Sequence, residues 1–185
     1  CVNSSYIKLA KKELQKSEVK ICGVVGFPLG AMSSESKLFE AQSALSDGAD
    51  EIDMVMNIGL LKSHDYDAFA EDIRAIKKIM PNKVLKVILE TCYLDDDEII
   101  KASSIAIECG ADFIKTSTGF GTEGATVKNI RLMKYAAHKS NTKLKASGGI
   151  RNYNIAKEFI DLGVDRLGLS SSIAIVDGST GTSDY

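Results

Sequence analysis

The sequence has no tryptophan, two prolines and two histidines among its 185 residues. His64 and His138 lie far apart in the chain, without the short spacing that brings two histidines onto one metal ion. The four cysteines, which form neither a C-x-x-C pair nor a dense disulfide framework, are Cys1, Cys22, Cys92 and Cys109. These absences argue against a histidine-based metal site and predict a reducing, cytoplasmic setting. We expect both histidines at the surface.

The sequence also lacks an excess of charge of either sign. Lysine and arginine number 23 against 25 aspartates and glutamates, for a net charge of −2. Proteins that bind nucleic acid or a membrane surface usually carry a basic patch, so we predict neither partner. No apolar run is long enough to span a bilayer, and no signal peptide is visible. A hydrophobic content of 44% is enough for one well-buried domain.

What the sequence does contain is an internal repeat. In three segments a helical pattern closes with glycine, aspartate follows two residues later, and an apolar strand begins: "LSDGADEID", "IECGADFIK" and "FIDLGVDRLG". The glycines of these segments, Gly48, Gly110 and Gly163, suit the left-handed residue just past a helix C-terminus. The repeat predicts strands over 51–56, 112–117 and 165–170.

Strands and helices are expected to alternate along the rest of the chain. Further strands are predicted at 19–26, 84–90 and 143–148. Helical patterns cover 4–16, 35–47, 65–79, 95–109, 124–139 and 152–162. Ser33 is expected to cap the second helix, "LDDDE" (94–98) to open the fourth, and Thr122 or Glu123 to open the fifth.

This alternation predicts right-handed βαβ units and a parallel sheet with helices outside it. An open doubly wound sheet is the alternative to a (β/α)8 barrel, which typically needs about 250 residues. Polar residues at the C-terminal ends of most strands favour the barrel, as do glycine- and serine-rich turns after two late strands. Six strands are visible, and residues 1–3 could be the tail of another.

Lys115 stands inside a predicted apolar strand, where a lysine needs a partner or a use. It lies five residues after Gly110, just as Asp53 lies five after Gly48. Equivalent places in two repeats should occupy one inward-facing layer of a barrel. We therefore expect Asp53 and Lys115 to meet inside the sheet.

Lys145, on the following strand, adds a second inward lysine. Adjacent strands lie about 4.8 Å apart, and one ammonium beside another favours loss of a proton. A neutral, desolvated amine attacks carbonyl groups and forms a Schiff base. Asp53 and Glu90 could move protons within reach. The alternative for any single lysine at a strand end is an ordinary ion pair, which we expect for Lys86 with Asp53 or Glu90.

Two turns are predicted to cradle phosphate. "SGGIR" (147–151) and "RLGLSSS" (166–172) place small residues and free backbone N–H groups between a strand and a helix. "GFGTEG" (119–124) matches the dinucleotide-binding pattern G-x-G-x-x-G. The next strand, however, ends in "KASGG" without the acidic residue that would bind the ribose, so we interpret this segment as a glycine-rich loop only.

Along essentially its whole length the chain resembles the deoxyribose-phosphate aldolase family. The segments that carry the resemblance are "GVVGFPLGA", "DGADEIDMVMNIG", "LKVILETCYL", "CGADFIKTSTGF" and "KASGGIR". The resemblance implies a (β/α)8 barrel and a class I aldolase that works without a metal or other cofactor. It implies reversible cleavage of 2-deoxy-D-ribose 5-phosphate to acetaldehyde and D-glyceraldehyde 3-phosphate.

The resemblance also implies roles for individual residues. Lys115 matches the Schiff-base lysine, Lys145 the lysine that lowers its pKa, and Asp53 the aspartate of a proton relay through water. The residues that match the phosphate cradle are Gly148, Gly149, Ser170 and Ser171. Tyr185 matches a tyrosine at the C-terminus that assists proton transfer. Leu169 and Ser172 depart from the family pattern, in which threonine and glycine are usual.

From the resemblance we expect residues 1–185 to form a single TIM-barrel domain that lacks its first strand and most of its second. The substrate would be a small sugar phosphate, and the chain could form a homodimer. Two alternatives stay open: an inactive, N-terminally truncated remnant that still binds sugar phosphates, or another phosphate-binding barrel aldolase.

Overall fold

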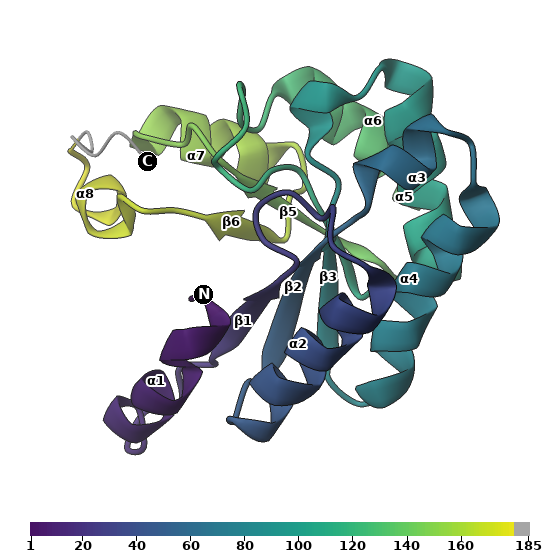
Figure 1. Ribbon diagram of the computed structural model, residues 1–185. Coiled ribbons are helices and arrows are strands. Elements are labelled where there is room, and N and C mark those ends of the chain that lie inside the picture. Colours follow the sequence, from purple (N-terminus) through teal and green to yellow (C-terminus); the bar gives the residue numbers. More distant parts are fainter. Residues whose placement is uncertain (180–185) are drawn as a thin grey trace.

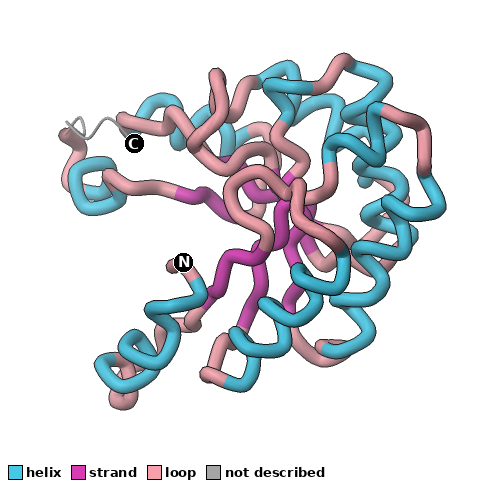
Figure 2. The backbone as a smooth tube through the Cα atoms, viewed as in Figure 1, coloured by secondary structure: helices cyan, strands magenta, loops and turns pink. Residues whose placement is uncertain are grey.

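The computed structural model describes residues 1–179 and is built around one parallel sheet whose six strands follow the order of the chain (Figure 1). The strands are β1 (Cys22–Val25), β2 (Glu51–Val55), β3 (Val84–Ile88), β4 (Phe113–Lys115), β5 (Lys143–Ser147) and β6 (Arg166–Gly168). The sheet curls strongly, with helices on its outer side and one side left open between β1 and β6 (Figures 1 and 2). Six parallel strands in a curled half-barrel confirm the predicted α/β class.

Helices connect successive strands on the outside of the curl, as expected for right-handed βαβ units. The longer ones are α1 (Ile7–Glu13), α2 (Ser34–Ser46), α4 (Tyr66–Ile79), α5 (Asp96–Glu108), α6 (Val127–Ala137) and α7 (Tyr153–Asp161). Shorter ones that the sequence patterns did not predict are α3 (Ile58–Lys62) and α8 (Ser172–Val176). Two 3₁₀ turns, η1 (Ser4–Tyr6) and η2 (Thr91–Tyr93), complete the described elements. Within residues 1–179 no helix has the length and apolar content needed to cross a membrane.

Side-chain caps explain where several helices begin. Ser33 accepts a hydrogen bond from the Ser36 backbone N–H at the start of α2, as predicted. The acidic segment before α5 forms a capping box in which Asp95 and Glu98 accept from each other's backbone N–H groups. The acidic first turn also favours the positive end of the helix dipole. The prediction that this segment is a helix start is confirmed.

The start of α6 differs from the prediction. The helix begins at Val127 after a Thr126 cap, and neither Thr122 nor Glu123 opens it. The segment before it is held in another conformation, because the Ala125 N–H donates to the carbonyl oxygens at the end of β5, both at 3.1 Å. A tertiary contact therefore overrides the local helical pattern.

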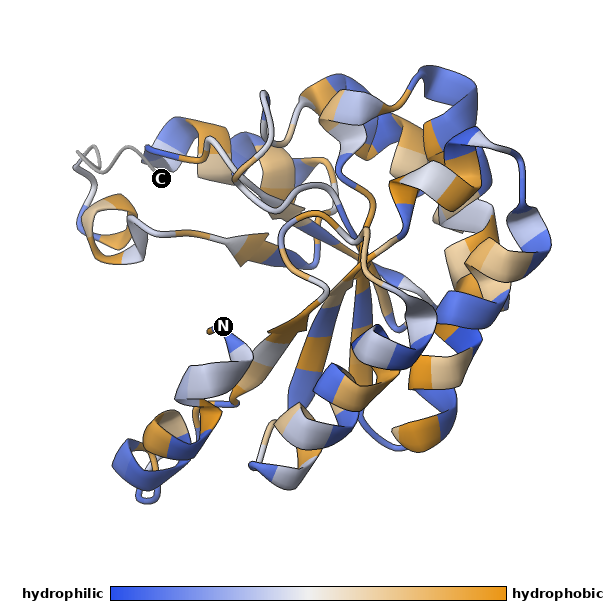
Figure 3. Cartoon of the chain, in the orientation of Figure 1, coloured by the Kyte–Doolittle hydropathy of each residue, from blue (hydrophilic) through white to orange (hydrophobic). Residues whose placement is uncertain are grey.

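The glycines of the repeat end their helices as expected. Gly48, Gly110 and Gly163 have φ values of 107°, 84° and 89°, in the left-handed region that favours glycine. At the N-terminal edge of the sheet, Val2 forms an isolated parallel bridge with Gly23, which supports the prediction that residues 1–3 are the tail of a further strand. Hydrophilic positions alternate with apolar ones along the strands of the sheet (Figure 3).

The strand register brings the repeat positions together. Asp53 pairs with Lys86, and Lys86 with Phe113, whereas Lys115 pairs with Lys145. Lys115 therefore lies two residues further along its strand than the row of Asp53. In a barrel-like sheet the strands are tilted, so a residue two positions further along the second-next strand lies at the same height along the barrel axis. Alternate strands therefore supply the side chains of one layer. Asp53 and Lys115 thus share a layer, as the repeat predicted.

Candidate active site

The centre of the site is the carboxylate of Asp53, which is fully buried on β2 and contacts three lysines. Lys115 and Lys145 approach one oxygen, with Nζ–Oδ2 distances of 2.8 and 2.7 Å. Lys86 approaches the other oxygen, with an Nζ–Oδ1 distance of 2.7 Å. The sheet thus brings three of the predicted residues, Asp53, Lys115 and Lys145, into direct contact.

Lys86 forms the ion pair that was predicted for it, with Asp53 as the partner. It also contacts Glu51, at an Nζ–Oε2 distance of 2.5 Å, and Glu51 in turn binds Arg166 at 2.7 Å. Burial favours the neutral form of Lys86, but the nearby Asp53 carboxylate prevails and raises the pKa of this lysine. Lys86 therefore stays positively charged beside Asp53.

The pKa shifts of the site follow from burial and charge. Burial raises the pKa of Asp53, but the ammonium groups of Lys115, Lys145 and Lys86 together outweigh burial and lower it well below its usual range. Burial lowers the pKa of Lys145, and the neighbouring Lys115 ammonium acts in the same direction against the attraction of Asp53. Burial and repulsion therefore destabilise the protonated form of Lys145.

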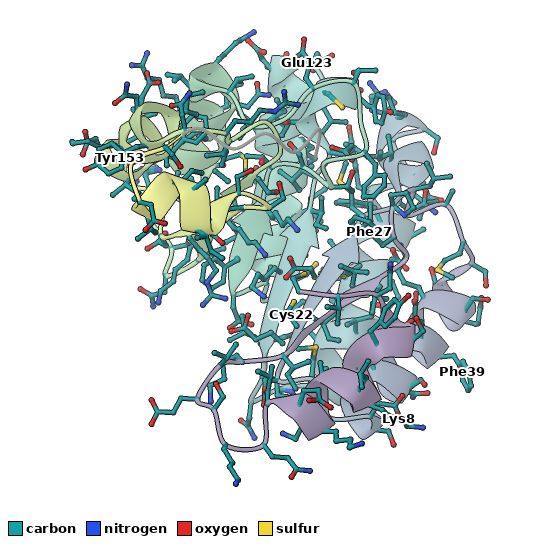
Figure 4. The ribbon with its side chains drawn as sticks, turned by 90° about the vertical axis from the view of Figure 1, so that its left-hand side faces the viewer. Lys8, Cys22, Phe27, Phe39, Glu123 and Tyr153 are labelled. Atoms are coloured by element: carbon teal, nitrogen blue, oxygen red, sulfur yellow. The ribbon has the colours of Figure 1, made fainter. Side chains whose placement is uncertain are left out.

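Sequence reasoning missed Cys22, which lies on β1 and is labelled in the view into the open side of the sheet (Figure 4). Its thiol donates to Asp53 Oδ1 at 3.1 Å. Burial and the Asp53 charge raise the pKa of this thiol to about 11, so Cys22 stays a neutral donor. No motif points to Cys22: the register pairs it with Glu51, and its thiol reaches Asp53 two residues further along β2.

A cavity of about 340 Å³ opens beside the two lysines at the C-terminal ends of the strands. Its walls come from the loop after β4, the turn after β5 and the turn after β6, and the lining residues include Lys115, Lys145, Thr118, Phe120, Gly148, Gly149, Gly168 and Ser170. Ser171, the next residue, is not among the lining residues; it is buried and is the N-cap residue of α8. Tyr185 lies outside the described residues.

Glycines keep the cavity open at two points. Gly148 and Gly149 have φ values of 83° and 75°, so the turn after β5 takes a backbone conformation that other residues rarely adopt. At Gly168 a Cβ would lie 2.8 Å from the Ser147 Cβ and 3.3 Å from the Lys145 Cε. Gly168 lies five residues after Gly163, so the third repeat places a glycine where the first two place Asp53 and Lys115. Sequence reasoning did not draw this conclusion.

Glu90 does not join the lysine cluster. Its carboxylate accepts hydrogen bonds from Thr118 on the loop after β4. Among the described residues no ion pair links it to Lys115 or Lys86. The interpretation of Glu90 as a proton carrier is therefore not supported. His64 and His138, in contrast, lie at the surface as predicted.

Comparisons with known proteins agree with this arrangement. Residues 1–164 match the model of the DeoC/LacD family aldolase. A deoxyribose-phosphate aldolase of Finegoldia magna is 55% identical over 96% of this chain and 83% of its own length. One of Lactococcus lactis subsp. lactis is 50% identical over 100% of this chain and 84% of its own length.

Among solved structures, an aldolase called QR15 superposes with a TM-score of 0.91 at 47% identity, over 96% of this chain and 79% of that one. A putative deoxyribose-phosphate aldolase from Coccidioides immitis gives a TM-score of 0.94 at 40% identity, over 96% and 71%. The relatives share this chain's sequence and fold over nearly its whole length. The chain therefore belongs to the DeoC/LacD family, and within it to the deoxyribose-phosphate aldolases.

Proposed function

We propose that the protein is a class I aldolase that cleaves 2-deoxy-D-ribose 5-phosphate reversibly to acetaldehyde and D-glyceraldehyde 3-phosphate. The observation that carries the proposal is the pair of buried lysines on one carboxylate oxygen beside the cavity. Class I aldol chemistry needs a neutral amine, and two ammonium groups on one buried carboxylate favour the loss of one proton. The family supplies the substrate.

Lys115 is the nucleophile in this mechanism. Lys115 and Lys145 both contact the same Asp53 oxygen, so loss of one proton relieves the repulsion between the two ammonium groups. The neutral Lys115 amine attacks the open-chain aldehyde carbon, C1, and the carbinolamine loses water to give a protonated imine. Asp53 passes protons between the lysines and the reacting atoms, through a water molecule where the distance requires one.

The protonated imine at C1 accepts the electrons of the bond that breaks. Charge is stabilised at C2, so the C2–C3 bond is the one cleaved, and the proton leaves the C3 hydroxyl. D-Glyceraldehyde 3-phosphate departs as the aldehyde, and C1 and C2 remain as the enamine of acetaldehyde. Protonation at C2 and hydrolysis then release acetaldehyde and free Lys115. We propose that Tyr185 assists this protonation.

The far end of the substrate is held by the two turns after β5 and β6. Gly148, Gly149, Ser170 and Ser171 present backbone N–H groups and hydroxyls that suit a phosphate. Holding the phosphate fixes the distance between the aldehyde carbon and Lys115, which is how binding energy contributes to rate. Leu169 replaces the usual threonine between these groups and leaves the backbone donors in place.

At the level of the whole chain we propose that residues 1–185 belong to a single domain of the (β/α)8 barrel type, of which the six described strands are part. The consecutive strand order and the layering of alternate strands support this proposal. A homodimer in the cytoplasm also belongs to the proposal, as in the sequence-based expectation. An inactive sugar-phosphate-binding remnant is less favoured, because the chain retains both lysines, the aspartate and the glycine turns.

Borohydride trapping tests the proposal directly. Reduction in the presence of acetaldehyde should leave an adduct of two carbons on Lys115, mapped by peptide mass spectrometry. An adduct on Lys145 or Lys86 instead would overturn the assignment of the nucleophile. A panel of sugar phosphates separates this enzyme from other Schiff-base aldolases, because only the acetaldehyde-forming enzyme should turn over 2-deoxy-D-ribose 5-phosphate.

A further inference from the structure

We propose that Glu90 is a positioning residue that anchors the β4–α6 loop (residues 116–126) over the cavity and so aligns the sugar phosphate with Lys115. The inference rests on the proposed function, because it assumes that Lys115 is the reacting amine. Glu90 acts through Thr118. The argument combines the backbone of Glu90, its hydrogen bonds and the packing of the loop.

The backbone at Glu90 is unusual. Its φ and ψ values of 52° and 63° lie in the left-handed region, directly after β3. Glycine adopts this conformation freely, whereas a residue with a side chain is strained there. Such a conformation persists only where the surrounding structure fixes it, and it is common at functional sites. The contacts of the Glu90 side chain indicate what holds this conformation in place.

The side chain of Glu90 bonds mainly to one loop residue, Thr118, besides a long contact from the Cys92 thiol at 3.9 Å. With only 2% of its surface exposed, its carboxylate accepts from the Thr118 N–H at 3.2 and 3.3 Å and from the Thr118 hydroxyl. The same hydroxyl oxygen accepts from the Phe120 N–H at 3.0 Å, which orders the next turn of the loop. Hydrogen bonds to a carboxylate are stronger than neutral ones. Within residues 1–179 no lysine, arginine or histidine pairs with Glu90, so the loop offsets its burial.

The loop also packs closely against Glu90 and Cys92. At Gly121 a Cβ would lie 2.6 Å from the Cys92 Sγ and 3.1 Å from the Glu90 Cδ. The far end of the loop is tied to the turn after β5, where a Cβ on Gly124 would lie 2.2 Å from the Gly148 carbonyl oxygen. The loop therefore bridges two anchors, Glu90 on one side and the proposed phosphate turn on the other.

Between these anchors the loop forms a wall of the cavity. Thr118, Gly119 and Phe120 line it together with Lys115 and Lys145. A wall that moves by about 1 Å can lower the rate on the order of a hundredfold when the substrate must be held in one orientation. A substrate of two carbons needs no such wall to reach Lys115. Loss of the anchor should therefore affect the sugar phosphate far more than acetaldehyde.

The test compares Glu90→Gln and Thr118→Val with the matched control Thr118→Ser, which keeps the hydroxyl. We expect kcat/KM for 2-deoxy-D-ribose 5-phosphate to fall roughly tenfold to a hundredfold in the first two variants, and to stay within about twofold of the wild type in the control. The rate of borohydride trapping with acetaldehyde should stay within about twofold in all three. The Glu90→Gln/Thr118→Val double variant should be no worse than the worse single variant, because both break one contact.

Three results would overturn the inference: unchanged cleavage in Glu90→Gln and Thr118→Val, a parallel loss of acetaldehyde trapping, or additive losses in the double variant. If Glu90→Gln does not fold, Thr118→Val alone carries the test. Amide hydrogen exchange of the loop provides a readout that does not depend on activity, and it should be faster in Thr118→Val than in the wild type. A wild-type protein that neither traps acetaldehyde nor cleaves the sugar would refute the proposed function, while the exchange result would still decide the role of Glu90.

Discussion

At the scale of single residues, the two oxygens of Asp53 have different partners. Oδ1 receives Lys86 and the Cys22 thiol, whereas Oδ2 receives Lys115 and Lys145 beside the cavity. The first set fixes the carboxylate in place, and the second is available for chemistry. The repeat and the period of two along a strand could predict that Asp53, Lys115 and Lys145 meet. They could not predict Cys22, because its strand lies outside the repeat.

The coupling between the lysines leads to a prediction about pH. Lys145→Leu removes the second ammonium on the Asp53 oxygen, and with it the repulsion that favours loss of a proton from the pair. We expect a loss of roughly a hundredfold or more at pH 7, with the acidic limb of the pH–rate profile moved to higher pH and partial recovery in alkaline solution. Lys143→Leu, on the same strand but without a contact to Asp53, is the control. An unchanged pH–rate profile in Lys145→Leu would show that the two lysines are not coupled.

At the scale of elements, the helices and strands that follow a local pattern were predictable, and those shaped by distant contacts were not. The capping box before α5 and the glycines after three helices are local signals, and both are present. The start of α6 depends on the bonds from Ala125 to the end of β5, which lie 22 or more residues away in sequence. A helical pattern over 124–139 contains no trace of that contact.

A buried ion pair between α2 and α4 provides a test at this scale. Lys37 and Asp72 lie 2.5 Å apart with side chains exposed by 0% and 1%. Asp72→Asn leaves the lysine charge buried without its partner and should lower the free energy of unfolding by about 3–5 kcal/mol. Asp161→Asn, which breaks the exposed pair with Lys157 on α7, should leave it nearly unchanged, because solvent screens an exposed pair. Denaturant unfolding of both variants compares them; equal small losses would show that the α2–α4 pair does not hold the helices together.

At the scale of the whole molecule, burial is uneven across the sheet. Residues of β2 and β3 are almost entirely buried, whereas β6 is exposed or half-buried and, among the described strands, pairs only with β5. We expect amide hydrogen exchange to be slowest in β2 and β3 and fastest in β6, because unpaired and solvated backbone groups exchange from small local openings. Mass spectrometry of peptides from each strand measures this gradient. Protection of β6 equal to that of β3 would mean that another chain segment or a second copy covers it.

The two ends of the site are built from different parts of the fold, and this has a practical consequence for enzyme design. The proposed nucleophile Lys115 and the Asp53 carboxylate lie on strands, whereas the proposed phosphate cradle is made from the turns after β5 and β6. To accept aldehydes without phosphate, those turns could therefore be redesigned while Lys115, Lys145 and Asp53 are left unchanged. The limit to such redesign is Gly168, because a side chain there would clash with the Ser147 Cβ and crowd the Lys145 side chain. Variant libraries that change these turns but keep Gly168 would test new aldehyde substrates while the lysine cluster stays intact.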